Sequence, residues 1–236
     1  MKLKAVVFGF VFLNACFLQA QELVFPPKIN FFQYSESSSR GLLYEIPNAR
    51  VWGWSNNGKV ACSVERQVDG RGGQIIDFVI LDLITDDTVF ELKMDSFDYN
   101  DAEDEALYNF SMAAISNALR THNISWQGTE FFRFPIRKND IVYGSRIINV
   151  ETQKFDFGFD TVVSKYSVLV TADEKRKIIG TFTPVSTVTG YVYVCGYVLS
   201  PFENRALVVV AEEHWGHEGT ELTYRFSGCN LGVGFN

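Results

Sequence analysis

The sequence is poor in the side chains that ligate transition metals or carry redox chemistry. It has 3 histidines and 4 cysteines in 236 residues, and no two cysteines have the Cys-x-x-Cys spacing of zinc-thiolate and dithiol redox sites. The sequence therefore predicts neither kind of site. Cys62, Cys195 and Cys229 stand in apolar, strand-like contexts that favour buried thiols. In an oxidising compartment one disulfide between two of them is possible, and the sequence does not choose the pair.

Positive charge is also scarce. Lysine and arginine number 21 against 28 aspartate and glutamate residues, so the formal net charge is −7 at pH 7. Nucleic acids and anionic lipid surfaces attract basic proteins, so neither is an expected partner. Hydrophobic residues make up 47% of the chain and charged residues 21%, which is typical of a folded globular protein rather than a disordered one.

No hydrophobic run is long enough to cross a membrane. The apolar run at residues 5–13 has about nine residues, whereas a spanning helix needs about 20. Lys2 and Lys4 precede this run, which is the pattern of an export signal. Cleavage after Ala20 would make residues 1–20 a signal peptide. Cleavage before Cys16 is the alternative, because Leu13-Asn14-Ala15-Cys16 resembles a bacterial lipobox.

The cleavage site decides how the protein meets a membrane. Cleavage at the lipobox leaves residues 1–15 as the signal and makes Cys16 the predicted lipidation site. Cleavage after Ala20 leaves the protein free in the periplasm or beyond. Both alternatives predict an exported bacterial protein, either periplasmic or a membrane-anchored lipoprotein. The N-terminal lipid is its only expected contact with the membrane.

Short apolar strands separated by turns dominate the rest of the chain. Residues 58–65, 162–170 and 191–199 have the two-residue alternation or the β-branched and aromatic content of strands. The sequence predicts a mainly β fold of antiparallel sheets. Residues 41–236 are interpreted as a single β-rich domain and residues 21–40 as an N-terminal extension.

One segment has helical periodicity instead. Leu107, Phe110, Ala114 and Ala118 recur at the spacing of one helix face and predict a single amphipathic helix over about residues 100–122. Acidic residues crowd its start, where the helix dipole favours negative charge. A calcium loop is the less favoured interpretation of these acids, because no series of ligands follows them.

A hairpin unit occurs twice, over about residues 50–92 and 190–232. Each copy has an aromatic strand, a turn, an apolar strand that ends in a glutamate (Glu65 or Glu212), a glycine turn and a further strand. A unit used twice predicts a reduced propeller-like arrangement, or two packed sheets related by pseudo-symmetry.

The turn of the first copy resembles a known repeat. Gly53-Trp54-Ser55-Asn56-Asn57-Gly58-Lys59-Val60-Ala61 looks like the repeat of TolB-type (WD40-like) β-propellers, in which an aromatic-Ser-Pro-Asp-Gly-Lys turn introduces an apolar strand. The paired units, with Gly216-His217-Glu218-Gly219 before the last strand, are similar to a family of predicted secreted bacterial proteins of unknown function. These resemblances imply a β-rich exported protein and bring no activity with them.

The strongest candidate for chemistry is the turn that holds His214, His217 and Glu218. Imidazole and carboxylate groups suit a divalent metal ion, so these residues are the predicted metal ligands. Their spacing is not that of the helical His-Glu-x-x-His motif, so nothing makes the two rings converge. A solvated polar turn is therefore favoured over a metal site. The sequence predicts no catalytic residue and no cofactor.

The lack of a catalytic set favours a binding role. The expected function is that of an exported, non-enzymatic β-rich protein that binds a protein or an envelope component. The alternative is a metal-dependent or other hydrolase that uses His214, His217 and Glu218. Function must be inferred from a site, so the positions of these side chains separate the two hypotheses.

Overall fold

The computed structural model describes residues 25–32, 43–68, 72–100, 104–125, 130–155, 160–216 and 219–236. These residues form strands β1 to β13, the 3-10 helix η2 and the helix α1. The bounds are β1 Leu43–Glu45, β2 Asn48–Trp54, β3 Lys59–Gln67, β4 Gln74–Asp82, β5 Asp87–Asp95, η2 Ser96–Tyr99, α1 Asp104–Thr121, β6 Phe131–Phe132, β7 Ile136–Lys138, β8 Ile141–Lys154, β9 Thr161–Ala172, β10 Lys175–Phe182, β11 Thr189–Leu199, β12 Arg205–Trp215 and β13 Thr220–Asn230.

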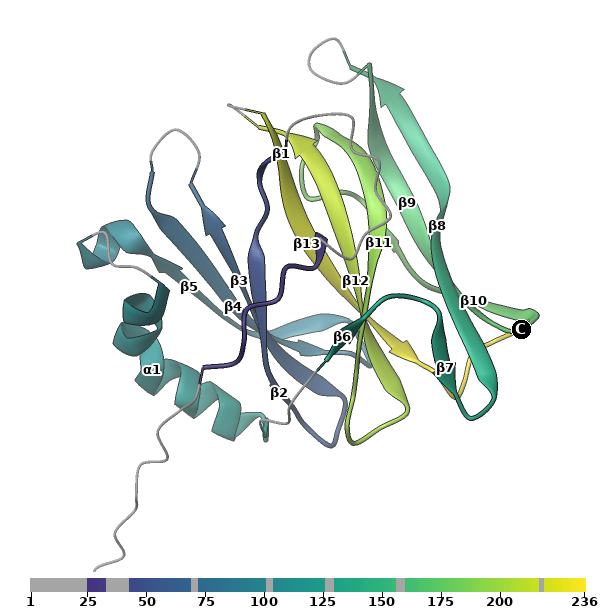
Figure 1. Cartoon of the computed structure of the whole chain (residues 1–236), viewed down its shortest axis with the longest axis horizontal. Helices are drawn as coiled ribbons and strands as arrows, with labels where there is room; N and C mark the ends of the chain where they lie inside the picture. The colour runs from purple at the N-terminus through teal and green to yellow at the C-terminus, as the bar shows by residue number, and fades with distance from the viewer. Residues whose placement is uncertain are drawn as a thin grey trace, which may run out of the picture.

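The strands of the described residues form three sheets (Figure 1). The helix-side sheet has the order β2-β3-β4-β5, the central sheet β1-β13-β12-β11-β6, and the outer sheet β10-β9-β8-β7. Neighbouring strands are antiparallel, except that β1 runs parallel to β13. The prediction of a mainly β fold with antiparallel sheets in a reduced, propeller-like arrangement and one helix is confirmed.

The three sheets stack face to face and fan out from one end, as neighbouring propeller blades do (Figure 1). Strand β12 shows the reason. Val208 and Val210 enter the core shared with the outer sheet, whereas Leu207 enters the core shared with the helix-side sheet. A strand covered on both faces needs a continuous apolar run, and residues 206–211 supply it because all of them are fully buried.

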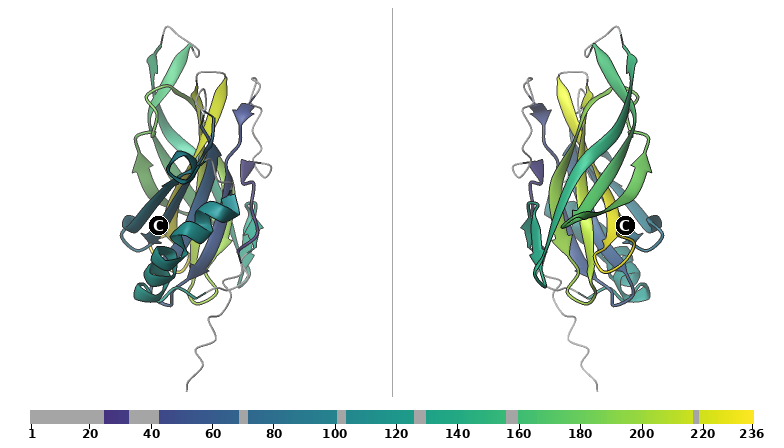
Figure 2. Two further views of the ribbon diagram at one scale, coloured as in Figure 1. Left: turned by 90° about the vertical axis from the view of Figure 1, so that its left-hand side faces the viewer. Right: turned by 90° about the vertical axis from the view of Figure 1, so that its right-hand side faces the viewer.

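Helix α1 covers the remaining face of the helix-side sheet (Figure 2, left). Leu107, Tyr108, Ile115 and Ala118 lie on one face of the helix and share a core with Phe78 and its neighbours. The helix spans Asp104–Thr121, inside the predicted range of about 100–122.

The outer sheet forms the opposite end of the stack. One of its faces packs on the central sheet through Tyr166, Val168 and Val170. No described element covers its other face (Figure 2, right). Strand β8 continues beyond the core, where Val150 is exposed.

Residues 1–24 lie outside the described residues. The signal peptide of residues 1–20 or 1–15 and the lipidation of Cys16 therefore stay predictions. In the part of the chain that the structure describes, no helix combines the length and the hydropathy needed to cross a membrane.

Candidate functional site

Of the three predicted metal ligands, only His214 lies within the described residues, and His217 and Glu218 lie outside them. The His214 ring is on β12, and its Nε2 lies 3.0 Å from Thr223 Oγ1 on β13. Burial lowers the pKa of His214, so the ring is neutral at pH 7. Among the described residues, no group of three or more His, Cys, Asp or Glu side chains is placed to hold a metal ion. The metal site at this turn stays a prediction.

The described cysteines are structural. Cys62, Cys195 and Cys229 are buried free thiols, with no disulfide among them. Burial raises the pKa of Cys195 to about 12 and the pKa of Cys229 to about 11, and it raises the pKa of Cys62 as well. Because the thiolate is the reactive form, these side chains act as small hydrophobic groups in the core.

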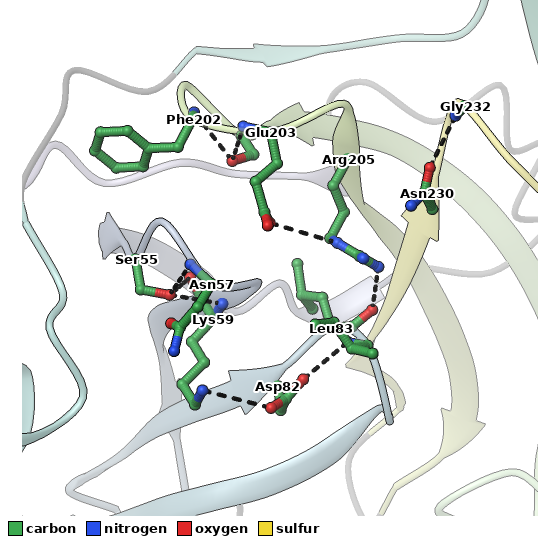
Figure 3. A network of polar contacts seen from close by, with 12 residues as sticks. Ser55, Asn57, Lys59, Asp82, Leu83, Phe202, Glu203, Arg205, Asn230 and Gly232 are labelled. Atoms are coloured by element: carbon green, nitrogen blue, oxygen red, sulfur yellow. Dashed lines mark hydrogen bonds and ion pairs between the residues drawn. The ribbon is translucent and has the colours of Figure 1, made fainter.

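A network of polar contacts lies where the two repeated hairpins turn (Figure 3). In the β2–β3 turn the Ser55 hydroxyl accepts hydrogen bonds from the backbone N–H groups of Asn57 and Lys59. In the β11–β12 turn the Ser200 hydroxyl accepts from the N–H groups of the residues at 202 and 203. A serine hydroxyl that accepts hydrogen bonds from N–H groups a few residues later in the sequence stabilises a turn without contacts from distant segments.

The two turns also bind the following strands in the same way. In both units the N–H of a leucine (Leu83 or Leu231) donates to a carbonyl of the turn. The side chain of the residue before the leucine (Asp82 or Asn230) accepts a hydrogen bond from the N–H of the residue after the leucine. The leucine bonds run from the Leu83 N–H to the Gly58 carbonyl and from the Leu231 N–H to the Asn204 carbonyl, at 2.8 Å each. The side-chain bonds run from the Ile84 N–H to Asp82 Oδ1 at 2.9 Å and from the Gly232 N–H to Asn230 Oδ1 at 2.8 Å.

This equivalence explains the position of α1. It aligns Lys59 with Arg205, and therefore Ala61 with Leu207. Ala61 packs against α1, whereas Leu207 packs against the helix-side sheet. Helix α1 therefore takes the place on the helix-side sheet that a neighbouring sheet takes on the central sheet. A helix stands where a further blade would stand.

Side chains from both units tie these turns together. Arg205 Nη1 donates to the Leu83 carbonyl at 2.7 Å, and Arg205 Nε lies 3.6 Å from Glu203 Oε2 (Figure 3). Asp86 of the first unit accepts a 2.7 Å hydrogen bond from the Gly228 N–H of the second. We call residues 55–59, 82–86, 200–205 and 228–233 the loop cluster.

Three apolar side chains of the loop cluster are exposed. Ile84 is 61% exposed, Phe202 43% and Val233 61%. In Figure 3 the Phe202 ring points away from the polar network. The charged groups beneath are paired, Lys59 with Asp82 at 3.5 Å and Arg205 with Glu203. Exposed apolar groups on a backbone held by hydrogen bonds suit binding rather than acid–base chemistry.

Buried glutamates cross-link the layers elsewhere. Glu65, on β3, lies 2.5 Å from Arg50 Nε and 2.9 Å from Lys28 Nζ, and it accepts a 3.0 Å hydrogen bond from the Tyr108 hydroxyl. These contacts connect the helix-side sheet to α1 and to the segment before β1. Every partner contributes to the fold, so this cluster is structural.

Glu212 does the same between the central and outer sheets. It accepts hydrogen bonds from the Tyr166 hydroxyl at 2.5 Å, from Arg225 Nε at 2.8 Å and from the Val185 N–H at 2.7 Å. Burial, and after it the neighbouring carboxylate, raise the pKa of Tyr166, so this phenol stays protonated and donates.

The sequence pattern located the two turns but not the contacts between them. The contacts of Arg205 with Leu83 and of Gly228 with Asp86 join residues 122 and 142 positions apart. The repeated hairpin was the available signal, because equivalent units in one fold tend to pack on each other. The repeat did not indicate that Arg205 of the second unit would donate a hydrogen bond to Leu83 of the first unit.

Comparison of the chain with protein-family models, with curated proteins and with solved structures gave no match. Function therefore has to be inferred from the loop cluster and from the surfaces of the fold.

Proposed function

We propose that this chain is an exported, non-enzymatic β-rich protein that binds a protein or an envelope component through the loop cluster. The observation that carries the proposal is the exposure of Ile84 and Phe202 next to backbone that Arg205 and Ser200 hold, with Val233 exposed beside them on a carbonyl that accepts from Lys177. A surface that is rigid before binding loses little conformational entropy when a partner docks.

Binding energy concentrates in a few well-placed side chains, and aromatic residues are prominent among them. Phe202 has this role in the proposal, with Ile84 as its apolar neighbour in the loop cluster. Export rests on different support, which is the N-terminal signal pattern and the resemblance of residues 53–61 to exported TolB-type repeats. The periplasmic or membrane-anchored location belongs to the same proposal.

The test compares three forms of the protein as bait for the envelope fraction of the source bacterium. The wild type, an Ile84→Ser/Phe202→Ser double variant and a Val185→Ser control are immobilised, and the affinity of each captured component is then measured. Val185 is 65% exposed and its N–H binds Glu212, near the end of β12 remote from Arg205. It therefore controls for the loss of an exposed apolar group.

We expect the wild type and the control to bind one component equally. We expect the double variant to bind it at least about tenfold more weakly, since losing a central anchor costs about 2 kcal/mol or more. Equal binding by all three forms would show that the loop cluster is not the binding surface.

A further inference from the structure

We propose that copies of this chain associate head to tail. The basic outer face of the outer sheet in one copy binds the acidic and aromatic end around α1 in the next copy. This inference concerns residues outside the loop cluster and does not depend on the proposed function.

The register of the outer sheet defines its exposed face. Cross-strand partners lie on the same face of a sheet, and neighbouring residues of a strand lie on opposite faces. Tyr143, Val168 and Val170 point into the core shared with the central sheet, so the residues that alternate with them point outward. The outward charged residues are Arg137, Arg146, Lys165, Arg176 and Glu151. Glu151 is paired with Lys165 at 3.5 Å, which leaves this face with a net positive charge.

The centre of this face is apolar. Ile178 on β10 is 51% exposed and pairs with Leu169 on β9, which in turn pairs with Arg146 on β8. Ile148 lies two residues along β8 from Arg146, on the same face. Arg146 and Arg176 therefore flank an apolar strip that no described element covers (Figure 2, right).

The opposite end of the stack has the complementary charge. Residues 96–105, from η2 to the start of α1, contain five aspartate and glutamate residues and no lysine or arginine. In the described part of this segment, Asp98 and Glu105 are exposed. These exposed acids give this end of the stack the charge opposite to that of the outer face.

Exposed aromatic side chains accompany these acids. Phe97 on η2 is 51% exposed, and Phe110 on α1 is 62% exposed. The Phe110 ring is stacked on Tyr99, with centroids 5.0 Å apart and an interplanar angle of 12°. We call Phe97, Asp98, Tyr99, Glu105 and Phe110 the acidic aromatic patch.

The two surfaces lie at opposite ends of the molecule. Helix α1 and the outer sheet are at the two ends of the longest axis in Figure 1, and Figure 2 shows each end face in turn. One copy therefore cannot join its own two ends. A contact between unlike surfaces of successive copies builds a ring or an open chain.

Charge favours this arrangement over a symmetric dimer. Two outer faces packed on each other would bring Arg146 and Arg176 against their own copies, and like charges across an interface are unfavourable. The head-to-tail contact instead places these arginines near Asp98 and Glu105. It also covers Ile178 with aromatic side chains from the next copy.

Sedimentation of the purified full chain at increasing concentration tests the inference. At an ionic strength of about 0.02 M we expect the average mass to rise with concentration above the 26.7 kDa of one copy. At about 0.5 M salt we expect the mass to fall back toward that of one copy, because exposed charges are screened at this ionic strength.

Two variants distinguish the head-to-tail contact from other contacts. Ile178→Asp damages the outer face, and Phe110→Ser damages the acidic aromatic patch. We expect each variant alone to remain a monomer. Mixed together they should form a 1:1 dimer and nothing larger, because each variant keeps the surface that the other has lost. Formation of this dimer also shows that both variants are folded.

A charge reversal on β8 supplies a matched control. Arg146→Glu removes an outward cation and should weaken association at least tenfold. Lys154→Glu changes the same charge on the same strand. The register of β8 shifts between Ile148 and Thr152, and Thr152 pairs with Val163 of the core, so Lys154, two residues further on, lies on the opposite face to Arg146. The Lys154 variant should associate as the wild type does.

Three results would overturn the inference. The first is a monomer at every concentration in low salt. The second is association that Ile178→Asp abolishes and Phe110→Ser leaves intact, which would indicate two outer faces packed together. The third is binding of the monomer to vesicles of anionic phospholipid through Arg146 and Arg176, without self-association, which would assign the basic face to a membrane.

Discussion

At the scale of single residues, buried charge holds the layers of this protein together. Removing a carboxylate from water is costly unless a cation and hydrogen-bond donors replace the solvent. Glu65 has Arg50, Lys28 and Tyr108 around it, and Glu212 has Arg225 and Tyr166. Each set of partners comes from more than one element, so each glutamate joins elements that are distant in the sequence.

Variants of Glu65 and Lys28 compare the contributions of a buried and an exposed ion-pair partner to the free energy of unfolding. Glu65→Ala leaves Arg50 as a buried cation without its carboxylate, so we expect the free energy of unfolding to fall by about 3–5 kcal/mol. Lys28→Ala should cost less than about 1 kcal/mol, because 41% of the Lys28 side chain is exposed. Urea denaturation at pH 7 measures both changes. Equal losses in the two variants would contradict this account of Glu65.

Glu65 and Glu212 occupy different positions in the two hairpin units, although the sequence repeat makes them look equivalent. Both end an apolar strand and look equivalent in the sequence. In the structure Lys59 is equivalent to Arg205. Counting along the two strands, Glu65 is then equivalent to Ala211, and Glu212 is equivalent to Arg66, the residue after Glu65. One residue of slip reverses the face of a strand. Glu65 therefore points to α1, whereas Glu212 points to the outer sheet.

At the scale of elements, short segments protect the edges of two sheets. Ser125 forms a bridge with Trp54 of β2, and β6 pairs with Tyr197 and Val198 of β11. The first strand of each unit bulges next to a glycine, Gly53 or Gly196, where the added segment approaches. Covering an edge in this way prevents unwanted pairing with other chains.

The glycine at 196 is required by this close approach. A Cβ atom at Gly196 would collide with the carbonyl oxygen of Phe132 and with the Phe131 ring. We expect Gly196→Ala to displace β6 and to lower the free energy of unfolding by about 1–3 kcal/mol. Hydrogen exchange of residues 131–132 and 197–198 should become faster.

Gly232→Ala is the control for this prediction. The nearest atom to its added Cβ would be the flexible amide of Asn204, at 3.1 Å, so we expect a much smaller change in stability. Unchanged exchange in the Gly196 variant would show that β6 does not depend on this glycine.

At the scale of the whole molecule, the fold is a finite stack whose two ends differ. Helix α1 covers one end, and the outer sheet leaves the other end uncovered by the described residues. A closed propeller has no such ends, because its last blade packs on its first. An open stack instead has two different end surfaces, one formed by α1 and one by the outer sheet.

The attachment of the whole molecule to a membrane is predicted to depend on Cys16. If the lipobox is used, the wild type should incorporate radioactive palmitate and sediment with membranes. Cys16→Ser should lose the label and become soluble. A single lipid chain gives only weak, reversible binding, so stable anchoring requires more than one chain on this cysteine. Absence of label on the wild type would favour cleavage after Ala20.

The sequence by itself determined the local features of this protein: the mainly β content, one helix within about residues 100–122, and a turn in each of the two hairpin units. These depend on alternation, helical spacing and backbone hydrogen bonds within a few residues. The position of α1 in the place of a blade, the link from Arg205 to Leu83 and the uncovered basic face were decided only by the tertiary structure. The physical reason is that strand register and the packing of distant segments select which face each side chain occupies, and no local pattern encodes that selection.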